Sequence, residues 1–468
     1  MSAHAEYQPV STYQAIASTN PVPLDNAADN ETPPKVKHYD VAVVGGGIVG
    51  LVLACGLRDT GLRVAVIEAQ TAEQAASRQR AYAFSPVSAK ILQGLGLWET
   101  VGPQLTPFQQ VRLSDADYGK AITFRPDHAP SQSMREAVYY SAEHTVLMAA
   151  LQSAVIAADN IDYWCEAQVL AQSDTSFGDV SSMASSSAEP FKARQSQLRR
   201  LARQSKAEET RLGVEQNAQH YEFRTPLVVG ADGARSGVRD RARIETFGWK
   251  YWQSCITAVL EPEKSHCNTA YEKFWPSGPF AILPLPNNRC QIVWTAPHDE
   301  AKAMLALPEE QFLQALSARY GDQMGKLRLV NQPMMFPVQL MQSKQYVQPG
   351  MALIGDAAHC CHPVGGQGLN MGIRDATALA EIIQQAAQAG ESLGSLKVLK
   401  RYERWRRTEN WFTLSLTDFL NRSFSNQFVP LVIARRMGIW ILDSVTPLKR
   451  LILRLMTGFF GKLPTKAK

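Results

Sequence analysis

The residues most able to do chemistry are glycines that follow the first apolar segment of the chain. Residues 39–44 (YDVAVV) lead into Gly45, Gly47 and Gly50, which form the pattern G-x-G-x-x-G at the start of a helical stretch. In such a turn the first glycine permits a tight bend, the second lets a phosphate approach the backbone, and the third lets the helix lie close to the strand. The helix N-terminus then faces the phosphate charge. The pattern predicts a binding site for a dinucleotide.

A carboxylate follows at the expected distance along the chain. Residues 63–67 form a second apolar strand that ends at Glu68, which is placed to accept hydrogen bonds from the hydroxyls of an adenosine ribose. The two strands, the glycine turn and the acid together favour a dinucleotide, but they do not choose between FAD and NAD.

Two later segments have the same strand-to-loop character. In residues 227–238 (LVVGADGARSGV) an apolar strand runs into Asp232 and Gly233. Taken without context, this could be an ordinary junction between a strand and a loop.

The second such segment is residues 351–375 (MALIGDAAHCCHPVGGQGLNMGIRD). An apolar strand ends there at Gly355 and Asp356, and a helix is expected to begin near Leu369. Only the combination of all three segments, at these separations, is informative.

Together the three segments resemble the three fingerprints of the class A flavoprotein monooxygenases, which have the fold of para-hydroxybenzoate hydroxylase. The resemblance implies non-covalently bound FAD, with Asp356 hydrogen-bonded to its ribityl chain. It also implies that Asp232 and Gly233 lie near the pyrophosphate and serve NAD(P)H docking, and that Arg80 contacts the cofactor.

The resemblance covers residues 39–464 apart from 173–219, and a narrower form of it is visible. The stretch HPVGGQGLNMGIRDA, together with LxxLGLW at residues 92–98, resembles the branch of ubiquinone-biosynthesis hydroxylases. Residues 249–294 look most like members from photosynthetic bacteria, in which the corresponding quinone would be plastoquinone.

The function implied is hydroxylation of the aromatic ring of a polyprenylated phenol or quinol, with NAD(P)H and O2 as co-substrates. The ring position is not implied. Two alternatives stay open: another FAD oxidoreductase on the same frame, such as a prenyl-chain reductase or halogenase, and a non-catalytic flavoprotein subunit of a quinone-biosynthesis complex.

The loop before the third helix suggests how the chain would serve a flavin. Reduced flavin is favoured by stabilised negative charge at the pyrimidine end of its ring, and a helix N-terminus offers free amides there. Pro363 would fix the turn, and the amides of Gly366, Gln367, Gly368 and Leu369 lie where they would point at the ring. We expect a larger side chain at Gly366 to displace the flavin and leave the fold intact.

The run His359-Cys360-Cys361-His362 could suggest a metal site. Neighbouring residues of an extended chain alternate between its two faces, so these four side chains cannot converge on one ion. We therefore expect no metal, and buried thiols beside the flavin. No motif indicates nucleic acid as a partner, and no second dinucleotide motif is present, so NAD(P)H would bind without a domain of its own.

The elements that position these residues indicate an α/β protein with a discontinuous Rossmann-like FAD domain, an inserted β-rich substrate domain and a helical C-terminal region. A hairpin is expected around Pro286-Asn287-Asn288. The expected divisions are a disordered tail (1–37), the first part of the FAD domain (38–246, with an insertion at 173–219 and further substrate-domain strands within 105–140), the main substrate domain (247–345), the second part of the FAD domain (346–394) and the basic helical region (395–468).

The C-terminal region carries an unusual charge. Residues 395–468 hold 15 Lys and Arg against 4 Asp and Glu, whereas the whole chain of 468 residues has a net charge of +5. An apolar stripe with helical spacing also runs through this region: Leu448, Leu451, Ile452, Leu455, Met456 and Phe459. Upstream of it, residues 430–442 carry two arginines, Arg435 and Arg436, amid the apolar residues Val432, Ile433, Ile439 and Trp440. We expect this segment to dock on an anionic membrane surface, or else to bury its stripe against the FAD domain or a partner subunit.

Cysteine usage indicates the compartment. Seven cysteines, an odd number without a CxxC pair, do not form a disulfide framework, and no apolar leader opens the chain. No apolar run reaches the length of about 18 residues that a membrane-spanning helix needs. We expect a cytoplasmic protein, held peripherally at the inner face of a membrane if the C-terminal region docks there.

Overall fold

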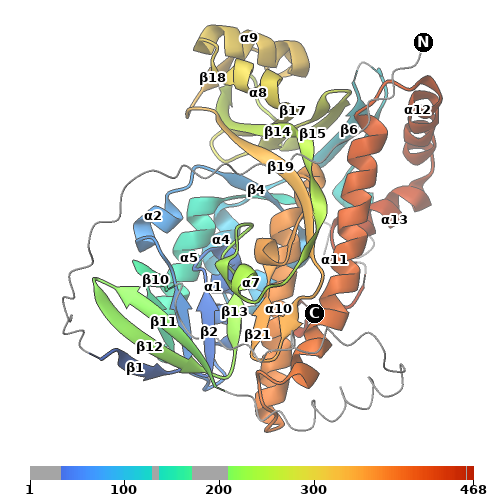
Figure 1. Cartoon of the computed structure of the whole chain (residues 1–468). Coiled ribbons are helices and arrows are strands. Elements are labelled where there is room, and N and C mark those ends of the chain that lie inside the picture. The colour runs from blue at the N-terminus through green and yellow to red at the C-terminus, as the bar shows by residue number, and fades with distance from the viewer. Residues whose placement is uncertain (1–32, 117, 129–135, 171–208, 460, 468) are drawn as a thin grey trace, which may run out of the picture.

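The computed structural model describes residues 33–116, 118–128, 136–170, 209–459 and 461–467 (Figure 1). At its centre lies a six-stranded sheet in which all neighbouring strands are parallel except at the β20 edge. Its strands, in spatial order, are β20 (Val347–Gln348), β21 (Met351–Leu353), β13 (Val228–Gly230), β2 (Val41–Val44), β3 (Val64–Ile67) and β9 (Ile161–Trp164).

The central sheet is covered on its faces, which explains its sequence. All residues of β2 and β3 are buried, and a parallel strand buried on both faces is a continuous apolar run rather than an alternating one. Helix α1 (Ile48–Leu57) packs against α5 (His144–Ile156) and α10 (Gln367–Gln388). These elements form the largest hydrophobic core of the described chain.

A four-stranded sheet lies beside the central one, in the order β1 (Lys35–His38), β12 (Gln219–Thr225), β11 (Thr210–Gln216), β10 (Ala167–Val169). Two expectations differ from it. Lys35–His38 form a strand paired with β12, so the folded chain begins before residue 38. Strand β11 occupies part of the expected insertion at 173–219, of which residues 173–208 lie outside the described residues.

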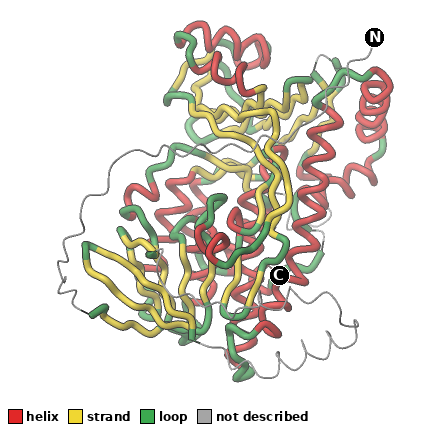
Figure 2. Tube along the Cα trace, in the orientation of Figure 1, coloured by secondary structure: helices red, strands yellow, loops and turns green. Residues whose placement is uncertain are grey.

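A nine-stranded sheet stands apart from the central sheet (Figures 1 and 2). Its strands, in spatial order, are β22 (His359–Cys360), β19 (Met334–Ser343), β14 (Thr246–Pro262), β17 (Cys290–Pro297), β16 (Gly278–Pro284), β15 (Thr269–Trp275), β6 (Gln110–Asp115) and β7 (Ala121–Phe124), with β18 (Leu327–Leu329) paired to β14. The expected hairpin is confirmed, because β16 and β17 pair antiparallel and both turn asparagines have positive φ. Helices α8 (His298–Leu305) and α9 (Glu309–Tyr320) pack on this sheet.

Small elements connect these layers. A three-stranded sheet has the order β4 (Ala81–Phe84), β8 (Tyr140–Glu143), β5 (Thr106–Pro107). The short helices are α2 (Ala72–Ala76), α3 (Pro86–Gly94), α4 (Trp98–Val101) and α7 (Gly237–Arg241).

The C-terminal part is helical, as expected. Helix α11 (Leu396–Phe424) packs against α10 and against strands β16 and β19, so it bridges the two large sheets (Figure 1). It is followed by α12 (Val429–Ser444) and α13 (Thr446–Met456). None of the helices in the described ranges is long and apolar enough to cross a bilayer.

Candidate active site

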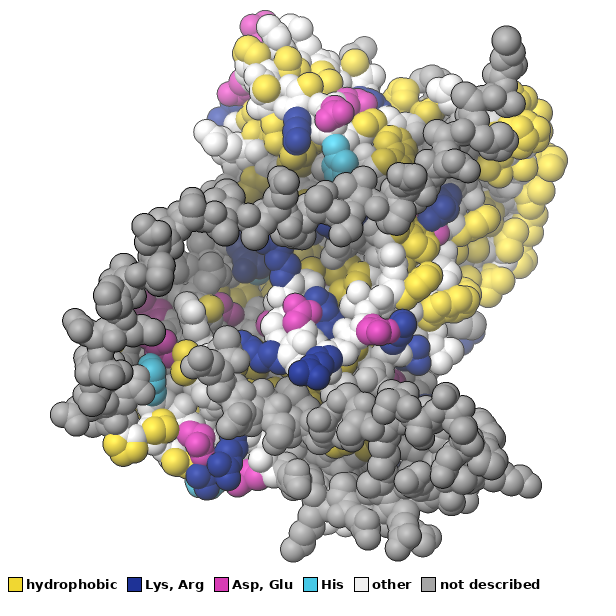
Figure 3. Space-filling view, in the orientation of Figure 1, with side chains coloured by type: hydrophobic (Ala, Val, Ile, Leu, Met, Phe, Trp, Pro, Cys, Tyr) yellow, Lys and Arg dark blue, Asp and Glu magenta, His cyan; other side chains and the backbone are white. Residues whose placement is uncertain are grey.

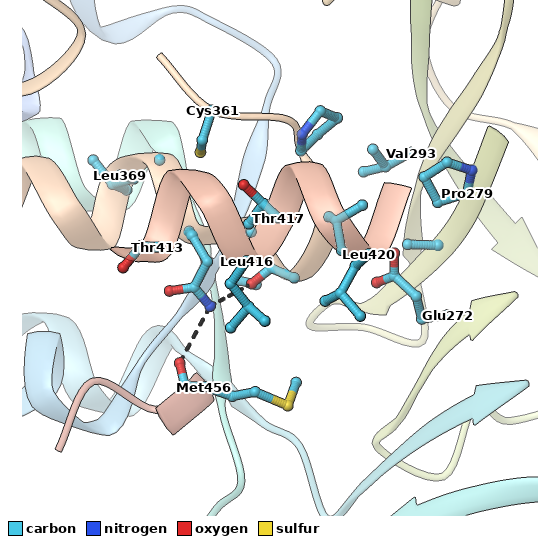
Figure 4. A pocket seen from close by; sticks show the side chains of 18 of the residues that line it. Glu272, Pro279, Val293, Cys361, Leu369, Thr413, Leu416, Thr417, Leu420 and Met456 are labelled. Atoms are coloured by element: carbon cyan, nitrogen blue, oxygen red, sulfur yellow. Dashed lines mark hydrogen bonds between the residues drawn. The ribbon is translucent and has the colours of Figure 1, made fainter. Parts of the chain in front are cut away.

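A cavity of about 1350 Å³ lies between the central sheet, the nine-stranded sheet and the C-terminal helices. One end is lined by residues of all three motifs, among them Gly47, Gly233 and Asp356. The other end is lined by apolar side chains of α11, α12 and α13, and Figure 4 shows part of this wall. A single space therefore joins the dinucleotide motifs to an apolar chamber.

The first glycine turn has the shape that its sequence predicts. Gly45 has a φ of +110°, and a Cβ there would lie 2.4 Å from the carbonyl oxygen of Ala231. A Cβ at Gly50 would lie 2.0 Å from the carbonyl oxygen of Gly45. At Gly47, by contrast, a Cβ would meet nothing within 4 Å, and this residue lines the cavity. Gly45 and Gly50 therefore permit close backbone packing, and Gly47 leaves open space where a phosphate could approach.

Glu68 is tied to this turn. Its Oε2 accepts a hydrogen bond from the amide of Gly46 at 2.8 Å, and its Oε1 accepts one from the amide of Gln70 at 3.0 Å. The Glu68 carboxylate, at the end of β3, therefore stabilises the glycine turn that follows β2. Its contact with a ribose stays a prediction.

Asp356 projects its carboxylate into the cavity. The side chain is accessible from the cavity inside the protein, which it lines together with Arg80. Burial within the protein raises the pKa of Asp356, and interactions with His359 and Arg80 oppose that rise. The Arg80 guanidinium lies 4.9 Å from the ring centre of Phe336 and 5.3 Å from that of Tyr82. The Asp356 carboxylate and the Arg80 guanidinium therefore line the same cavity, although they come from distant parts of the sequence.

At the second motif, the two residues are oriented differently. Asp232 Oδ2 accepts a hydrogen bond from the amide of Val238 at 3.1 Å, so this carboxyl caps the start of α7. Gly233, with a φ of +82°, lines the cavity together with Arg235. The backbone at Gly233, rather than the Asp232 side chain, is the part that lines the cavity.

The glycine loop before α10 departs from one expectation. The amide of Gly366 donates to the carbonyl of Pro363 at 3.0 Å, so it is not free to meet a flavin. The amides of Gln367, Gly368 and Leu369 belong to the first turn of α10, which has no intrahelical acceptors for them. All five of these residues line the cavity, and the three first-turn amides are the ones left to serve a ligand.

A buried ionic network, which the sequence pattern did not predict, lies under this loop. Asp375 of α10 is bonded to His359 Nε2 at 2.5 Å and to Arg406 Nε of α11 at 2.7 Å. Arg406 and Arg374 also both bind Glu409. The motif contained Asp375 and His359 but not Arg406 and Glu409, since these two come from α11. The network joins α10 to α11 behind the Gly355–Asp356 turn.

The four residues of the His-Cys-Cys-His run diverge. His359 turns to Asp375, and His362 packs edge-on against Tyr251, with ring centres 5.1 Å apart. Cys360 and Cys361 both line the cavity, although strict alternation would have separated them. No cluster of side chains within the described ranges could hold a metal ion.

Glu272 of β15 is a cavity residue that we did not identify from the sequence. Its carboxylate accepts a hydrogen bond from the amide of Gly365, and burial raises the pKa of Glu272 to about 7. The available signal was a single acid in a strand rich in aromatic residues, TAYEKFW.

The C-terminal stripe is turned inward rather than outward. Ile452, Leu455 and Met456 line the cavity, and Lys449 is buried with its Nζ 2.7 Å from Asp443. Of the stripe residues, only Leu451 is exposed. Helix α13 is therefore a wall of the cavity. It packs mainly with α12 and with strands β6 and β7 of the nine-stranded sheet, whereas the expected alternative was burial against the FAD domain or a partner subunit.

The arrangement fits FAD. Three features face one cavity: open space beside Gly47, a carboxylate at Asp356 that forms no ion pair with the residues the structure describes, and the first-turn amides of α10. These groups can receive a pyrophosphate, a ribityl chain and the pyrimidine edge of a flavin, respectively.

Comparisons with known proteins agree with this geometry. A family described as an FAD binding domain matches residues 38–415. The chain is 44% identical to the uncharacterized protein slr1300 of Synechocystis over 92% of this chain and 95% of that one, and 36% identical to the ubiquinone hydroxylase UbiL of Rhodospirillum rubrum over 89% of each. Among solved structures, p-nitrophenol 4-monooxygenase PnpA of Pseudomonas putida superimposes with a TM-score of 0.72 at 19% identity, covering 92% of this chain and 99% of that one.

The structural likeness shows the shared fold, and the sequence match extends through both parts of the cofactor end and the sheet between them. The chain belongs to the FAD-dependent aromatic monooxygenase family defined by this FAD binding domain.

Proposed function

We propose that this enzyme hydroxylates the aromatic ring of a polyprenylated phenol or quinol in the biosynthesis of ubiquinone or a related quinone such as plastoquinone. NAD(P)H would be the reductant and O2 the oxygen donor. The name of the Rhodospirillum relative, a ubiquinone hydroxylase, supports this substrate class.

The observation that carries the proposal is the continuity of the cavity. Its flavin end, at the glycine loop, opens directly into a chamber lined by apolar side chains of three helices, among them Leu416, Leu420, Ile439, Leu442 and Ile452. A ring held at the loop could extend a long isoprenoid chain into that chamber. Such a chain would bury apolar surface worth about 25 cal/mol per Å².

The chain's own groups have distinct tasks in this reaction. Bound FAD would accept electrons from NAD(P)H and activate O2, and no side chain can carry out these reactions. Asp356 would hold the ribityl chain, Arg80 would add positive charge beside it, and the first-turn amides of α10 would stabilise negative charge on the flavin ring. The apolar chamber excludes water from the reacting ring.

The decisive experiment compares two phenols on the FAD-loaded protein. A phenol with an isoprenoid chain should stimulate NAD(P)H oxidation, and its product should gain one oxygen by mass spectrometry. The same phenol without the chain should bind far less tightly. A product that gains hydrogen or a halogen would instead identify a prenyl-chain reductase or a halogenase, and no turnover with bound FAD would favour a non-catalytic subunit.

We further propose that the enzyme takes this substrate from a membrane surface, at a face formed by α11 and α12 rather than by the stripe on α13. The described chain exposes apolar side chains on α11 and α12, visible at the right of Figure 3. The face comprises Trp411, Phe412, Phe419, Phe428, Val429, Ile433, Met437, Trp440 and Ile441, and we call it the α11–α12 face.

The cavity itself points to lipid as the occupant of the α11–α12 face. Phe412 and Phe419 are 42% and 64% exposed, and both also line the cavity. The cavity therefore opens at this face, so a lipid-soluble substrate could enter without crossing water. A subunit of a quinone-biosynthesis complex is the alternative occupant.

Charge contributes less than the sequence suggested. Arg435 and Arg436 both bind Asp115, and Arg406 binds Asp375, so acids from outside the C-terminal region neutralise several of its cations. The docking proposal therefore rests on the apolar face and the cavity mouth, with exposed Arg450 and Arg454 as nearby cations.

A further inference from the structure

The side chain of Glu272, on β15, faces the cavity. On β15 successive side chains alternate between the two faces of the sheet. Lys273 extends to the other side, where its Nζ donates to the carbonyl of Tyr320 on α9 at 2.8 Å. Glu272 consequently faces the cavity, where its neighbours on the wall include Pro279, Val293 and Leu420 (Figure 4).

The carboxylate has little to compensate it there. Its hydrogen bond comes from the amide of Gly365, and no lysine, arginine or histidine in the described part of the chain forms an ion pair with it. The titratable groups that interact with its charge are Tyr139, between β7 and β8, and Cys255 of β14. An ionised group in an apolar cavity is costly unless a ligand compensates it.

The hydrogen bond places Glu272 at the reacting end of the cavity. Gly365 lies in the loop whose continuation, at the start of α10, would face the flavin. The Glu272 carboxylate therefore extends from the nine-stranded sheet to residues 363–369, at the start of α10, which we call the flavin loop. A substrate ring between the flavin and the nine-stranded sheet would have this group at its edge.

We propose that Glu272 accepts the proton of the substrate's ring hydroxyl during oxygen transfer, which rests on the proposed function. The O–H bond breaks and its electron pair enters the ring, which forms the new C–O bond with the oxygen delivered from O2. The intermediate dienone then loses the hydrogen of the attacked carbon as a proton, and Glu272 returns its proton to the dienone oxygen. NAD(P)H supplies two electrons, and the second oxygen atom leaves as water.

The acidity of the group suits this task. A general base is most effective when its pKa lies near the working pH, and burial raises the pKa of Glu272 to about 7. The ionised, proton-accepting form is then present above pH 7, so the rate should rise with pH through that value.

The test uses Glu272→Gln, in which the amide oxygen can still accept from Gly365 but cannot take a proton. With rates expressed per bound FAD, we expect kcat to fall by about 100-fold or more, KM to change little, and the rise of kcat/KM near pH 7 to vanish. Glu272→Asp should recover part of kcat. The matched control is Glu261→Gln on β14, where the glutamate forms an exposed ion pair with Arg328 of β18, and this variant should behave as the parent.

A second readout needs no turnover. The absorbance of 4-nitrophenol bound to the oxidised FAD protein reports whether its hydroxyl is ionised. Next to a carboxylate the bound phenol should stay protonated to higher pH, and Glu272→Gln should lower its apparent pKa by about one unit or more.

The outcomes separate the two proposals. A Glu272→Gln enzyme with parental kcat, a reduced kcat that keeps the rise near pH 7, or an unchanged pKa of bound nitrophenol would each overturn the role of Glu272. If the parent shifts the nitrophenol pKa but never oxygenates a prenylated phenol, the contact of Glu272 with a ring hydroxyl stands and the proposed function fails.

Discussion

Gln367 Nε2 donates to the carbonyl of Met456 at 3.2 Å, so the flavin loop is tied to the end of α13. The same amide also donates to the Tyr139 hydroxyl at 3.1 Å and to the carbonyl of Gly365 at 3.1 Å. The last helix is thus attached to the loop that would hold the flavin. Removing the chain after Ser444 would remove α13 and with it a wall of the cavity.

Replacing Gln367 by Met should loosen this attachment. The variant loses side-chain hydrogen bonds worth about 0.5 to 1.5 kcal/mol each, so we expect a lower Tm and faster loss of FAD on dilution. Gln385→Met, on the exposed side of the same helix, should change neither quantity. Equal FAD release from the two variants would show that the link does not hold the loop.

Asp356→Ala should weaken FAD retention. Loss of a hydrogen bond to a charged carboxylate typically costs about 1.5 to 3 kcal/mol, roughly a 10- to 100-fold weaker dissociation constant. Asp59→Ala, at a side chain that is 78% exposed, is the control. Parental affinity in Asp356→Ala, measured by flavin fluorescence, would contradict the assignment of this residue to the cofactor.

Two glycines of the loop should respond differently to a side chain. Gly366 has a φ of +61°, and a Cβ there would lie 2.6 Å from Cβ of Ala83, so Gly366→Val should lower the Tm instead of leaving the fold intact. The backbone conformation alone costs about 1 to 3 kcal/mol. At Gly368 the nearest atom, Cys361 Sγ, would be 3.7 Å away. Gly368→Val should therefore keep the parental Tm but release more H2O2 per NAD(P)H oxidised, and tightly coupled turnover would refute the position of the loop.

The network around Asp375 should make stability depend on pH. Burial alone would raise the pKa of Asp375, but the charges of His359 and Arg406 and hydrogen bonds from His359 and Asn410 outweigh it and hold that pKa below its usual value. Because the folded pKa is lowered, the stabilisation is present above the unfolded value of about 3.9 and is lost as pH falls below it. Tm should therefore drop steeply below pH 4.

Asp375→Asn isolates this contribution. It removes one of the two carboxylates that bind the buried Arg406 and leaves Glu409 as the other. Breaking a buried ion pair typically costs about 3 to 5 kcal/mol at neutral pH, and the variant should flatten the drop in Tm below pH 4. Asp59→Asn should keep the parental profile. An Asp375→Asn protein with the parental Tm and pH profile would contradict this account of the network.

Membrane docking can be tested without disturbing the cavity. Ile433→Ser with Trp440→Ser removes two exposed apolar side chains of α12, 60% and 52% accessible, and should reduce co-sedimentation with liposomes. Phe247→Ser with Trp252→Ser removes two equally exposed side chains of β14 and is the matched control. Equal sedimentation of the two double variants would exclude the α11–α12 face as the docking surface, and binding restored only by other quinone-biosynthesis proteins would favour the complex.

The sequence alone determined the features that depend on neighbouring residues. The G-x-G-x-x-G turn at Gly45, the apolar strands that precede Asp232 and Asp356, and the asparagine turn after β16 follow from backbone sterics and from the continuous apolar pattern of buried parallel strands. These constraints act within a few residues, so they can be recognised in the printed sequence.

The tertiary structure decided which distant residues share one space. Glu272 and Gly365 are far apart in the chain and meet because the nine-stranded sheet closes over the flavin loop. Arg436 finds Asp115 across 321 positions, which neutralises charge that the sequence assigned to a membrane. The amphipathic pattern of α13 fixed that it has an apolar face, but the same stripe satisfies a lipid surface and a cavity wall equally well. Only the packing of α13 beside Gln367 and α12 selected the cavity wall, because the free energy of burying a stripe does not depend on which apolar surface covers it.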